Sequence, residues 1–362
     1  MNIKKLFTDL RFLKIFIFGI TSGMPFAILY TTIIAWMNHF ELNFEMVTLL
    51  ATARMPYSLK FLWSPFLDYY TVPLIGRLLG RRRSWMMLTS LGIAAILYYM
   101  AGVTPSDENF YHLWRISVVL GFLAASYDIS YDALRIELLE PDEQAIGVAH
   151  SSVAYKVGVF LTGALALMYA HNHGWHDTFI MLAIFFIIGA FSSCVIQTPN
   201  KLKTIPESFF GSTINAFKDL MQRDYFLLIL STIIFYKIGD AMLAFVGMKF
   251  YTHLGFTLAE IAWVVKTCGV FATYVGCYFG AWVVSRCKGV KGLIICELAQ
   301  SITNLGYIWL THAGHDINVF LISNISENFT GGMGGADLSG YIANLCNVRF
   351  AATHFALLSS CA

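Results

Sequence analysis

The sequence predicts an all-α integral membrane protein. Of its 362 residues, 57% are hydrophobic and only 13% are charged, whereas a soluble domain carries ~25% charged residues. The mean hydropathy is +0.64. Apolar runs of about 20 residues, the length that crosses a bilayer as a helix, recur along the whole chain. These three observations place the chain among multi-pass membrane proteins.

Ten windows have the length and composition of a full membrane span. We expect them at 12–38, 45–67, 84–103, 112–136, 145–170, 174–197, 224–250, 257–284, 290–311 and 316–342. Pro25 and Pro56 are expected to kink the first two spans, because proline removes a helical N–H donor. A partial eleventh span begins near Phe350, and too few residues follow it to cross about 30 Å of hydrocarbon.

Positive charge alternates between the connections. Lysine and arginine occur before the first span and in every second connection after it, at Lys4, Lys5, Arg11, Lys14, Arg77, Arg81, Arg82, Arg83, Arg135, Lys201, Lys203, Lys218, Arg223, Arg286, Lys288, Lys291 and Arg349. The intervening connections, such as TPSDENFY and HNHGWHD, contain none. Because cytoplasmic loops carry the excess of basic residues, we expect the N-terminus and the basic loops to face the cytoplasm.

The longest connection follows the sixth span and divides the chain. We expect an N-terminal six-helix bundle at 1–197, a cytoplasmic linker at 198–223 and an incomplete C-terminal bundle at 224–362. Six spans, a polar linker and a second set of spans is the layout of major facilitator transporters. In that fold two pseudo-symmetric helix bundles rock around a site near the middle of the membrane.

Charged residues inside the expected fourth span are candidates for function. Asp128, Asp132 and Arg135 in SYDISYDALRIELL share one helical face. A charge at the bilayer centre costs about 2.5–3.5 kcal/mol by the lower estimates, so such residues usually serve a function. Two carboxylates this close cannot both ionise cheaply in a low dielectric. We therefore predict a proton-coupling region here, with Asp128 as the proton carrier; the alternative is a structural network that ties the span to the basic loops.

Ionisable residues near the middle of other expected spans are candidates for substrate binding. They come from both halves of the chain and are Arg54, Lys156, Lys237, Asp240, Lys266 and Glu327. Cations that converge on one cavity would bind an anion, most simply a carboxylate or phosphate. The alternative is mutual neutralisation by neighbouring carboxylates, since buried charges are normally paired.

Other patterns exclude several classes of function. No GxSxG or HExxH motif is present, which argues against an enzyme. The cysteines form no CxxC pair and the histidines lack metal-ligand spacing, so we expect neither a metal nor a cofactor. No basic tract with interleaved aromatics indicates nucleic-acid binding. Gly331 and Gly335, four residues apart, are expected to serve helix packing.

Five stretches resemble the AmpG muropeptide permease family of the major facilitator superfamily. They are GITSGMPFAILY, SLKFLWSPFLDYYTVPLIGRLLGRRRSW, YDISYDALRIELL, FYKIGDAMLAFVGMKFYTHLGFTLAEIAWVVKTCGVFATYVG and ENFTGGMGGADLSGYIANLCNVRFAATHFALLSS. The resemblance implies a monomeric symporter that uses the proton gradient to import anhydro-muropeptides across the bacterial inner membrane for peptidoglycan recycling. Basic residues would hold the carboxylates of such a substrate, and aromatic residues would stack on its disaccharide.

The chain departs from that family in length. Family members have twelve spans or more, so we expect this chain to be truncated within its eleventh. Two alternatives to the muropeptide importer remain open: a carrier of another organic anion, such as an acyl-CoA or a small metabolite, and a truncated remnant that does not transport.

Overall fold

The computed structural model describes residues 9–196, 209–222, 226–287 and 290–360 of the chain. Every regular element in these ranges is a helix, which confirms the predicted all-α class. Six segments in them are long and apolar enough to cross a membrane: Leu10–His39, Arg81–Ala101, Phe110–Leu138, Pro141–Val195, Trp263–Val284 and Lys291–Ala313. The total of ten full spans stays a prediction.

The first half of the chain forms a bundle of long helices. Its main members are α2 (Leu10–Ala27), α3 (Ile33–His39), α8 (Arg81–Ala101), α9 (Phe110–Leu138), α10 (Gln144–Thr162) and α11 (Ala164–Val195). A π-helical turn, η1 (Ile28–Thr32), joins α2 to α3 just after Pro25. Within α11, Gly174 has φ +84°, a conformation that glycine adopts at little cost. The predicted boundary between the fifth and sixth spans lies at this residue.

The segment expected as the second span is more interrupted than a single kink at Pro56 predicts. It consists of α4 (Phe44–Leu49), η2 (Leu50–Arg54), α5 (Met55–Leu59), η3 (Lys60–Leu62) and α6 (Ser64–Tyr69). Prolines occupy the first turns of both α5 and α6. A proline fits the first turn of a helix but cannot continue the one before it. Each proline therefore begins a new helix, and α7 (Ile75–Leu79) follows in the basic connection.

The second half contains fewer long helices. They are α13 (Phe226–His253), α14 (Leu258–Ile261) with the π-helical η5 (Ala262–Gly269), α15 (Val270–Arg286), α16 (Val290–Ala313), α17 (Ile317–Leu345) and α18 (Ala351–Ser360). Helix α18 begins where the partial eleventh span is expected. Of the predicted linker, residues 198–208 and 223 lie outside the described residues, and 209–221 form the helix α12 (Phe209–Met221).

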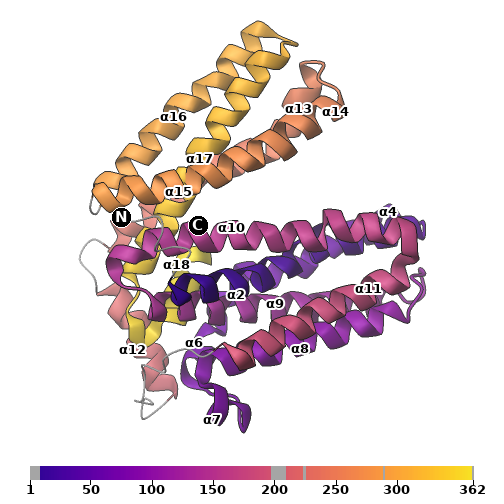
Figure 1. Ribbon diagram of the computed structural model, residues 1–362, viewed down its shortest axis with the longest axis vertical. Helices are drawn as coiled ribbons and strands as arrows, with labels where there is room; N and C mark the ends of the chain where they lie inside the picture. Colours follow the sequence, from indigo (N-terminus) through magenta and orange to yellow (C-terminus); the bar gives the residue numbers. More distant parts are fainter. Residues whose placement is uncertain (1–8, 197–208, 223–225, 288–289, 361–362) are drawn as a thin grey trace.

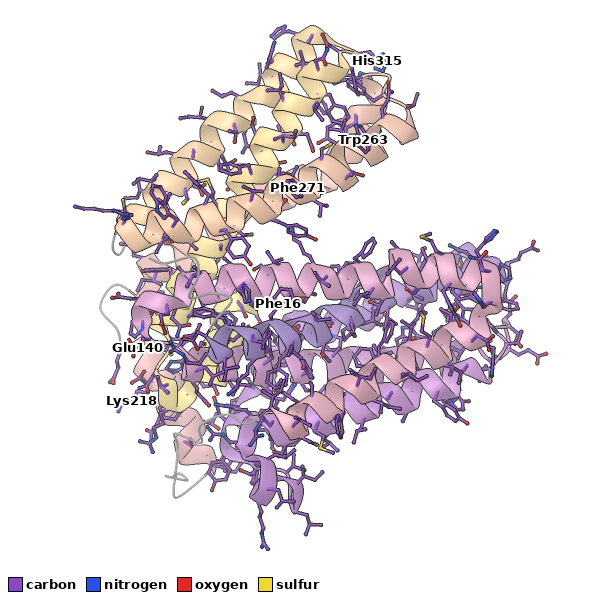
Figure 2. All side chains as sticks on the ribbon, in the orientation of Figure 1. Phe16, Glu140, Lys218, Trp263, Phe271 and His315 are labelled. Atoms are coloured by element: carbon purple, nitrogen blue, oxygen red, sulfur yellow. The ribbon has the colours of Figure 1, made fainter. Side chains whose placement is uncertain are left out.

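The two halves meet at one end and diverge toward the other (Figure 1). Glu140 and Lys218 lie at the end where they meet, whereas Trp263 and His315 lie at the far end of the second half (Figure 2). We call the end where the two halves meet the basic end. There α6 and α9 share a hydrophobic core with α17 and α18, which contains Leu67, Ile129, Ile136, Leu338, Ala351 and Phe355. Burial of this apolar surface joins the halves.

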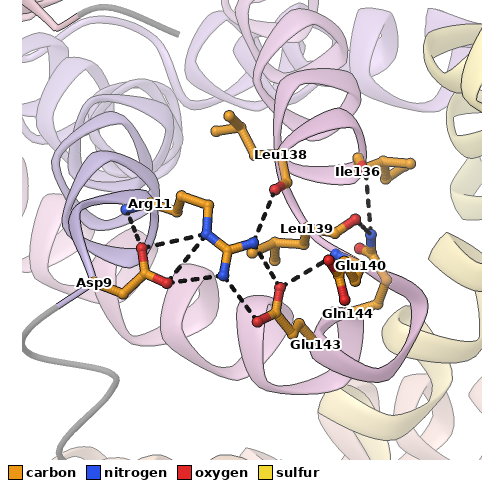
Figure 3. A network of polar contacts seen from close by, with 8 residues as sticks. All are labelled: Asp9, Arg11, Ile136, Leu138, Leu139, Glu140, Glu143 and Gln144. Atoms are coloured by element: carbon orange, nitrogen blue, oxygen red, sulfur yellow. Dashed lines mark hydrogen bonds and ion pairs between the residues drawn. The ribbon is translucent and has the colours of Figure 1, made fainter. Parts of the chain in front are cut away.

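Arg11 ties the start of α2 to the connection between α9 and α10 (Figure 3). Its Nη1 and Nη2 donate to the Glu143 carboxylate at 2.8 and 2.9 Å, and its Nη2 donates to Asp9 at 2.8 Å. Glu140 and Glu143 also form a capping box around the short helix Pro141–Glu143. The ends of three helices of the first half are therefore held together at the basic end.

Candidate functional site

A polar cavity of about 240 Å³ lies among α2, α9 and α10. Its lining residues are Ser22, Asp128, Tyr131, Asp132, Ser151, Ser152, Tyr155 and Lys156. Asp128 and Asp132 face it together because residues four apart lie on one side of a helix. Two carboxylates, three serine hydroxyls and one lysine therefore line one cavity.

Asp128 is the deepest acidic group of the cavity, with only 8% of its surface exposed. Ser22 Oγ on α2 donates a hydrogen bond of 2.5 Å to its Oδ1. Within the described part of the chain, no lysine or arginine forms an ion pair with Asp128. A buried carboxylate with one hydroxyl donor and no paired cation is costly to keep charged. Binding a proton would remove that cost.

Asp132 connects the cavity to Arg135. Arg135 Nη2 lies 3.3 Å from Asp132 Oδ1, and the guanidinium, 2% exposed, also lies 5.2 Å from the ring centroid of Phe355 on α18. Its Nε and Nη1 are buried without a hydrogen-bond partner. The three residues predicted to share one helical face therefore have different surroundings. The two aspartates line the cavity, whereas Arg135 points toward the second half.

Two of the predicted cations, Arg54 and Lys156, rest on aromatic rings. Lys156 Nζ lies 5.3 Å from the ring centroid of Tyr274 on α15, so this contact links the two halves beside the cavity. Arg54 Cζ lies 3.8 Å above the ring of Tyr30, and its Nε donates to Ala51 O at 3.1 Å. Neither cation has an ion-pair partner among the described residues. Cation–π contacts of this kind leave the charge available to an anion.

Glu327 lies elsewhere, in a polar network of the second half. Asn328 Nδ2 donates to its Oε2 at 2.8 Å, and Thr273 Oγ1 on α15 donates to Asn328 Oδ1 at 3.2 Å. The structure does not bring Glu327 to the lining of the cavity. Lys237 and Asp240 belong to α13 and Lys266 to η5, but their side chains are outside the described part of the structure.

Several lining residues were not predicted. The hydroxyls of Tyr131 and Ser151 lie 2.7 Å apart, and Tyr155 borders the cavity one helical turn further along α10. In the first span, Ser22, Phe26 and Tyr30 follow one another at intervals of four residues. That spacing was the available signal, because it places all three on one face of the helix.

The basic end contains a buried ionic network of the first half, which hydrogen bonds join to the second half. Arg82 Nη2 lies 2.7 Å from both Asp68 Oδ1 and Glu137 Oε1. Asp68 Oδ2 in turn accepts hydrogen bonds from the amide and the hydroxyl of Thr353, at 2.7 and 2.6 Å, in the first turn of α18. The N-terminal amides of a helix favour a negative charge. Asp68 thus fastens the second half to the first.

Comparison with known proteins identifies the family. The family model of the Major Facilitator Superfamily matches residues 7–361. The putative transporter AmpG 4 of Rickettsia conorii is 40% identical, over 99% of this chain and 88% of the relative. The anhydromuropeptide permease of Escherichia coli K12 is 30% identical, over 98% of this chain and 72% of the relative.

Solved structures agree on the fold. A bacterial homologue of the iron transporter ferroportin in an outward-facing state has a TM-score of 0.65 at 14% identity, covering 98% of this chain and 88% of that one. The human organic anion transporter MFSD10 has a TM-score of 0.59 at 13% identity, covering 96% and 89%. With the sequence matches, these results confirm the resemblance: the chain is a multi-pass membrane transporter of the Major Facilitator Superfamily, and within it belongs to the AmpG family.

Proposed function

We propose that the protein imports anhydro-muropeptides across the bacterial inner membrane, driven by the proton gradient, in the service of cell-wall recycling. The name of the Escherichia coli relative supports the substrate. Action as a monomer is part of the same proposal. With the basic loops in the cytoplasm, the basic end is the cytoplasmic end and the halves diverge toward the periplasm.

The observation that carries this proposal is that a buried carboxylate and a lysine share one cavity. Asp128 is shielded from water and bonded to Ser22, and Lys156 lines the same space. A carboxylate of the substrate would neutralise Lys156, and a proton would neutralise Asp128. The added proton and the added carboxylate cancel, so the net charge of the cavity would stay the same, but neither Asp128 nor Lys156 would remain as an unpaired charge. Because buried charge is what the low dielectric penalises, the halves could close over the loaded cavity more easily.

The roles of the other charged residues follow from the same arrangement. Asp132 and Arg135 would pass a change of charge in the cavity to α18, since they contact each other and Arg135 contacts Phe355. Arg54 would hold a second acidic group of the substrate. Lys237, Asp240, Lys266 and Glu327 stay proposed ligands from the second half.

Uptake in cells that lack their own muropeptide permease tests the proposal. Cells expressing this chain should accumulate radiolabelled anhydro-muropeptide, and a protonophore should abolish the accumulation. Excess unlabelled anhydro-muropeptide should compete, whereas an acyl-CoA should not. Competition by the acyl-CoA alone would favour the other organic-anion carrier, and absence of any uptake with normal membrane insertion would favour the non-transporting remnant.

Asp128→Asn tests the proton role. The variant should lose gradient-driven accumulation while it inserts into the membrane at the normal level. Asp142→Asn is a matched control, because Asp142 is an exposed carboxylate in the connection that follows α9. Full uphill accumulation by the Asp128 variant would remove this residue from proton coupling.

A further inference from the structure

Helix α12, in the predicted linker between the halves, has an apolar side that the rest of the described chain leaves uncovered. Its Phe210, Ile214 and Met221 are 75%, 63% and 64% exposed. With the exposed Lys218, they follow one another at intervals of three or four residues and so lie on one side of the helix. We call these four residues the outer face of α12. Water solvates such a face poorly, because its large side chains are apolar.

The opposite side of α12 is held against both halves of the protein. Ser212, Ala216 and Leu220 are buried there, and Leu220 belongs to the hydrophobic core that α6 shares with α18. His354 Nε2 of α18 donates to the Ala216 carbonyl oxygen at 2.8 Å. Asp219, the only acidic residue of α12, also faces α18, with Oδ2 3.9 Å from His354 Nε2. The charge on the outer face is therefore positive.

The position of α12 is at the boundary of the membrane. It lies beside α6 and α18 at the basic end (Figure 1), where the span Arg81–Ala101 begins. Phe209, the first residue of α12, has its ring centroid 5.7 Å from that of Tyr70, and Trp85 Nε1 donates to the Tyr70 carbonyl oxygen at 2.8 Å. Tyrosine and tryptophan are enriched where a bilayer meets water. A helix at this depth can bury an apolar face in the interfacial region.

The short helix α7, which follows Tyr70 in the chain, extends this surface. Leu74 and Leu78 are 78% and 84% exposed, and Arg77 between them is exposed as well. Within the described part of the chain, neither Arg77 nor Lys218 forms an ion pair. Helix α7 contains no acidic residue. Protruding apolar side chains and uncompensated positive charge thus occur together on both helices.

These features fit one kind of partner, the anionic phospholipids. Apolar side chains bury their surface among acyl chains, while the charged ends of lysine and arginine reach the phosphate groups. Anionic headgroups attract basic residues next to a membrane. An uncharged lipid would leave Arg77 and Lys218 without a counter-ion. A soluble protein would need the surface to lie outside the bilayer, whereas the rings around Tyr70 are typical of the interface.

We propose that the outer face of α12 and the exposed side of α7 form a binding surface for anionic phospholipid, with Lys218 and Arg77 holding phosphate groups. The inference depends on the membrane location of the family and is independent of which molecule is transported. Because His354 of α18 binds the inner side of α12, the bound lipid lies directly behind a contact between the linker and the second half.

Native mass spectrometry of the purified full chain, titrated with phosphatidylglycerol or phosphatidylcholine, tests the charge recognition. Arg77→Gln combined with Lys218→Gln should weaken phosphatidylglycerol binding by about 30-fold, since each basic residue at an anionic surface contributes about fivefold. Phosphatidylcholine binding should stay within about twofold. The matched control is Arg115→Gln with Lys249→Gln, an exposed pair near the start of α9 and the end of α13. Unchanged phosphatidylglycerol affinity, or an equal loss for both lipids, would overturn the surface.

A spin label at Ile214 tests the depth of the outer face. Ile214→Cys is labelled with a nitroxide in nanodiscs that contain phosphatidylglycerol, after the native cysteines are replaced. The label should collide more with oxygen, which concentrates in the bilayer, than with a water-soluble nickel complex. A label at Asp142→Cys, in the exposed connection after α9, should show the reverse. If both labels are equally accessible to nickel, the outer face lies in water and the proposal is wrong.

Discussion

Replacing Asp68 with asparagine should open the basic end. Asp68 is 5% exposed and lies at the junction of the two halves. Its contact with Arg82 is internal to the first half, so that contact does not oppose separation. The bonds to Asp68 that do cross the junction come from the amide and hydroxyl of Thr353, at 2.7 and 2.6 Å, and from the amide of Ala352, at 3.3 Å. The substitution removes the charge that makes these bonds strong.

The size of the effect follows from the two short bonds from Thr353. A hydrogen bond to a charged group contributes about 1.5–3 kcal/mol. Asparagine keeps one carbonyl acceptor, so we count the loss of one such bond, about 1.5–3 kcal/mol. At 1.4 kcal/mol per factor of ten, the ratio of closed to open basic ends falls about 10- to 150-fold. Arg82 stays paired with Glu137 at 2.7 Å, so the variant should still fold.

Distances between spin labels measure this equilibrium. Glu140 in the first half and Val348 before α18 are both exposed at the basic end and accept labels once the native cysteines are replaced. Asp68→Asn should shift the distance distribution to longer values, and Thr353→Val, which loses only the hydroxyl bond, should shift it less. Asp107→Asn, in an exposed loop at the other end, is the control. An unchanged distribution in Asp68→Asn would refute the reasoning.

Two further predictions concern contacts between helices. Lys156→Met and Tyr274→Leu, combined in a double-mutant cycle of unfolding in detergent, should give a coupling free energy of about 0.5–2 kcal/mol for the cation–π contact; a coupling near zero would show that the contact is not formed. Gly23→Ala should lower the melting temperature by an amount that corresponds to about 1–3 kcal/mol, because its methyl group would lie 1.9 Å from a carbonyl oxygen of α10. Gly102→Ala, whose nearest such atom lies 3.7 Å away, is the control, and equal stability of the two variants would contradict the packing argument.

The fold class could be predicted because composition and helix length are properties of the chain alone. Contacts between helices could not, because they depend on which face a neighbour covers. Gly331 and Gly335 illustrate this: a Cβ atom at Gly335 would meet nothing within 4 Å, so the predicted packing pair is wrong. The close contact instead involves Gly332, which would meet the Thr273 carbonyl oxygen at 2.4 Å. The four-residue spacing of the glycines therefore indicated correctly that α17 packs closely against a neighbour, but it indicated the wrong face of that helix.

The candidate site shows the same division. The four-residue spacing of Asp128 and Asp132 was enough to predict that they share one side of α9, and both line the cavity. That spacing could not predict that Arg135 turns to α18, because this depends on the ring of Phe355, far away in the sequence. The contact between Phe26 of α2 and Tyr155 of α10 could not be predicted either, because it depends on which helix packs against α2.

Helix α9 connects the cavity to the closure of the basic end by two separate routes that both reach α18. One runs from Asp132 through Arg135 to the ring of Phe355. The other runs from Glu137 through Arg82 and Asp68 to the first turn of α18. The first route is weaker, since it ends in a cation–π contact, and it starts at a residue that lines the cavity. The second is stronger and does not touch the cavity. Under the proposed function, a ligand or proton that changes the charge near Asp132 would act directly on the weaker route, while the stronger one would set how much free energy the ligand must supply before the halves part.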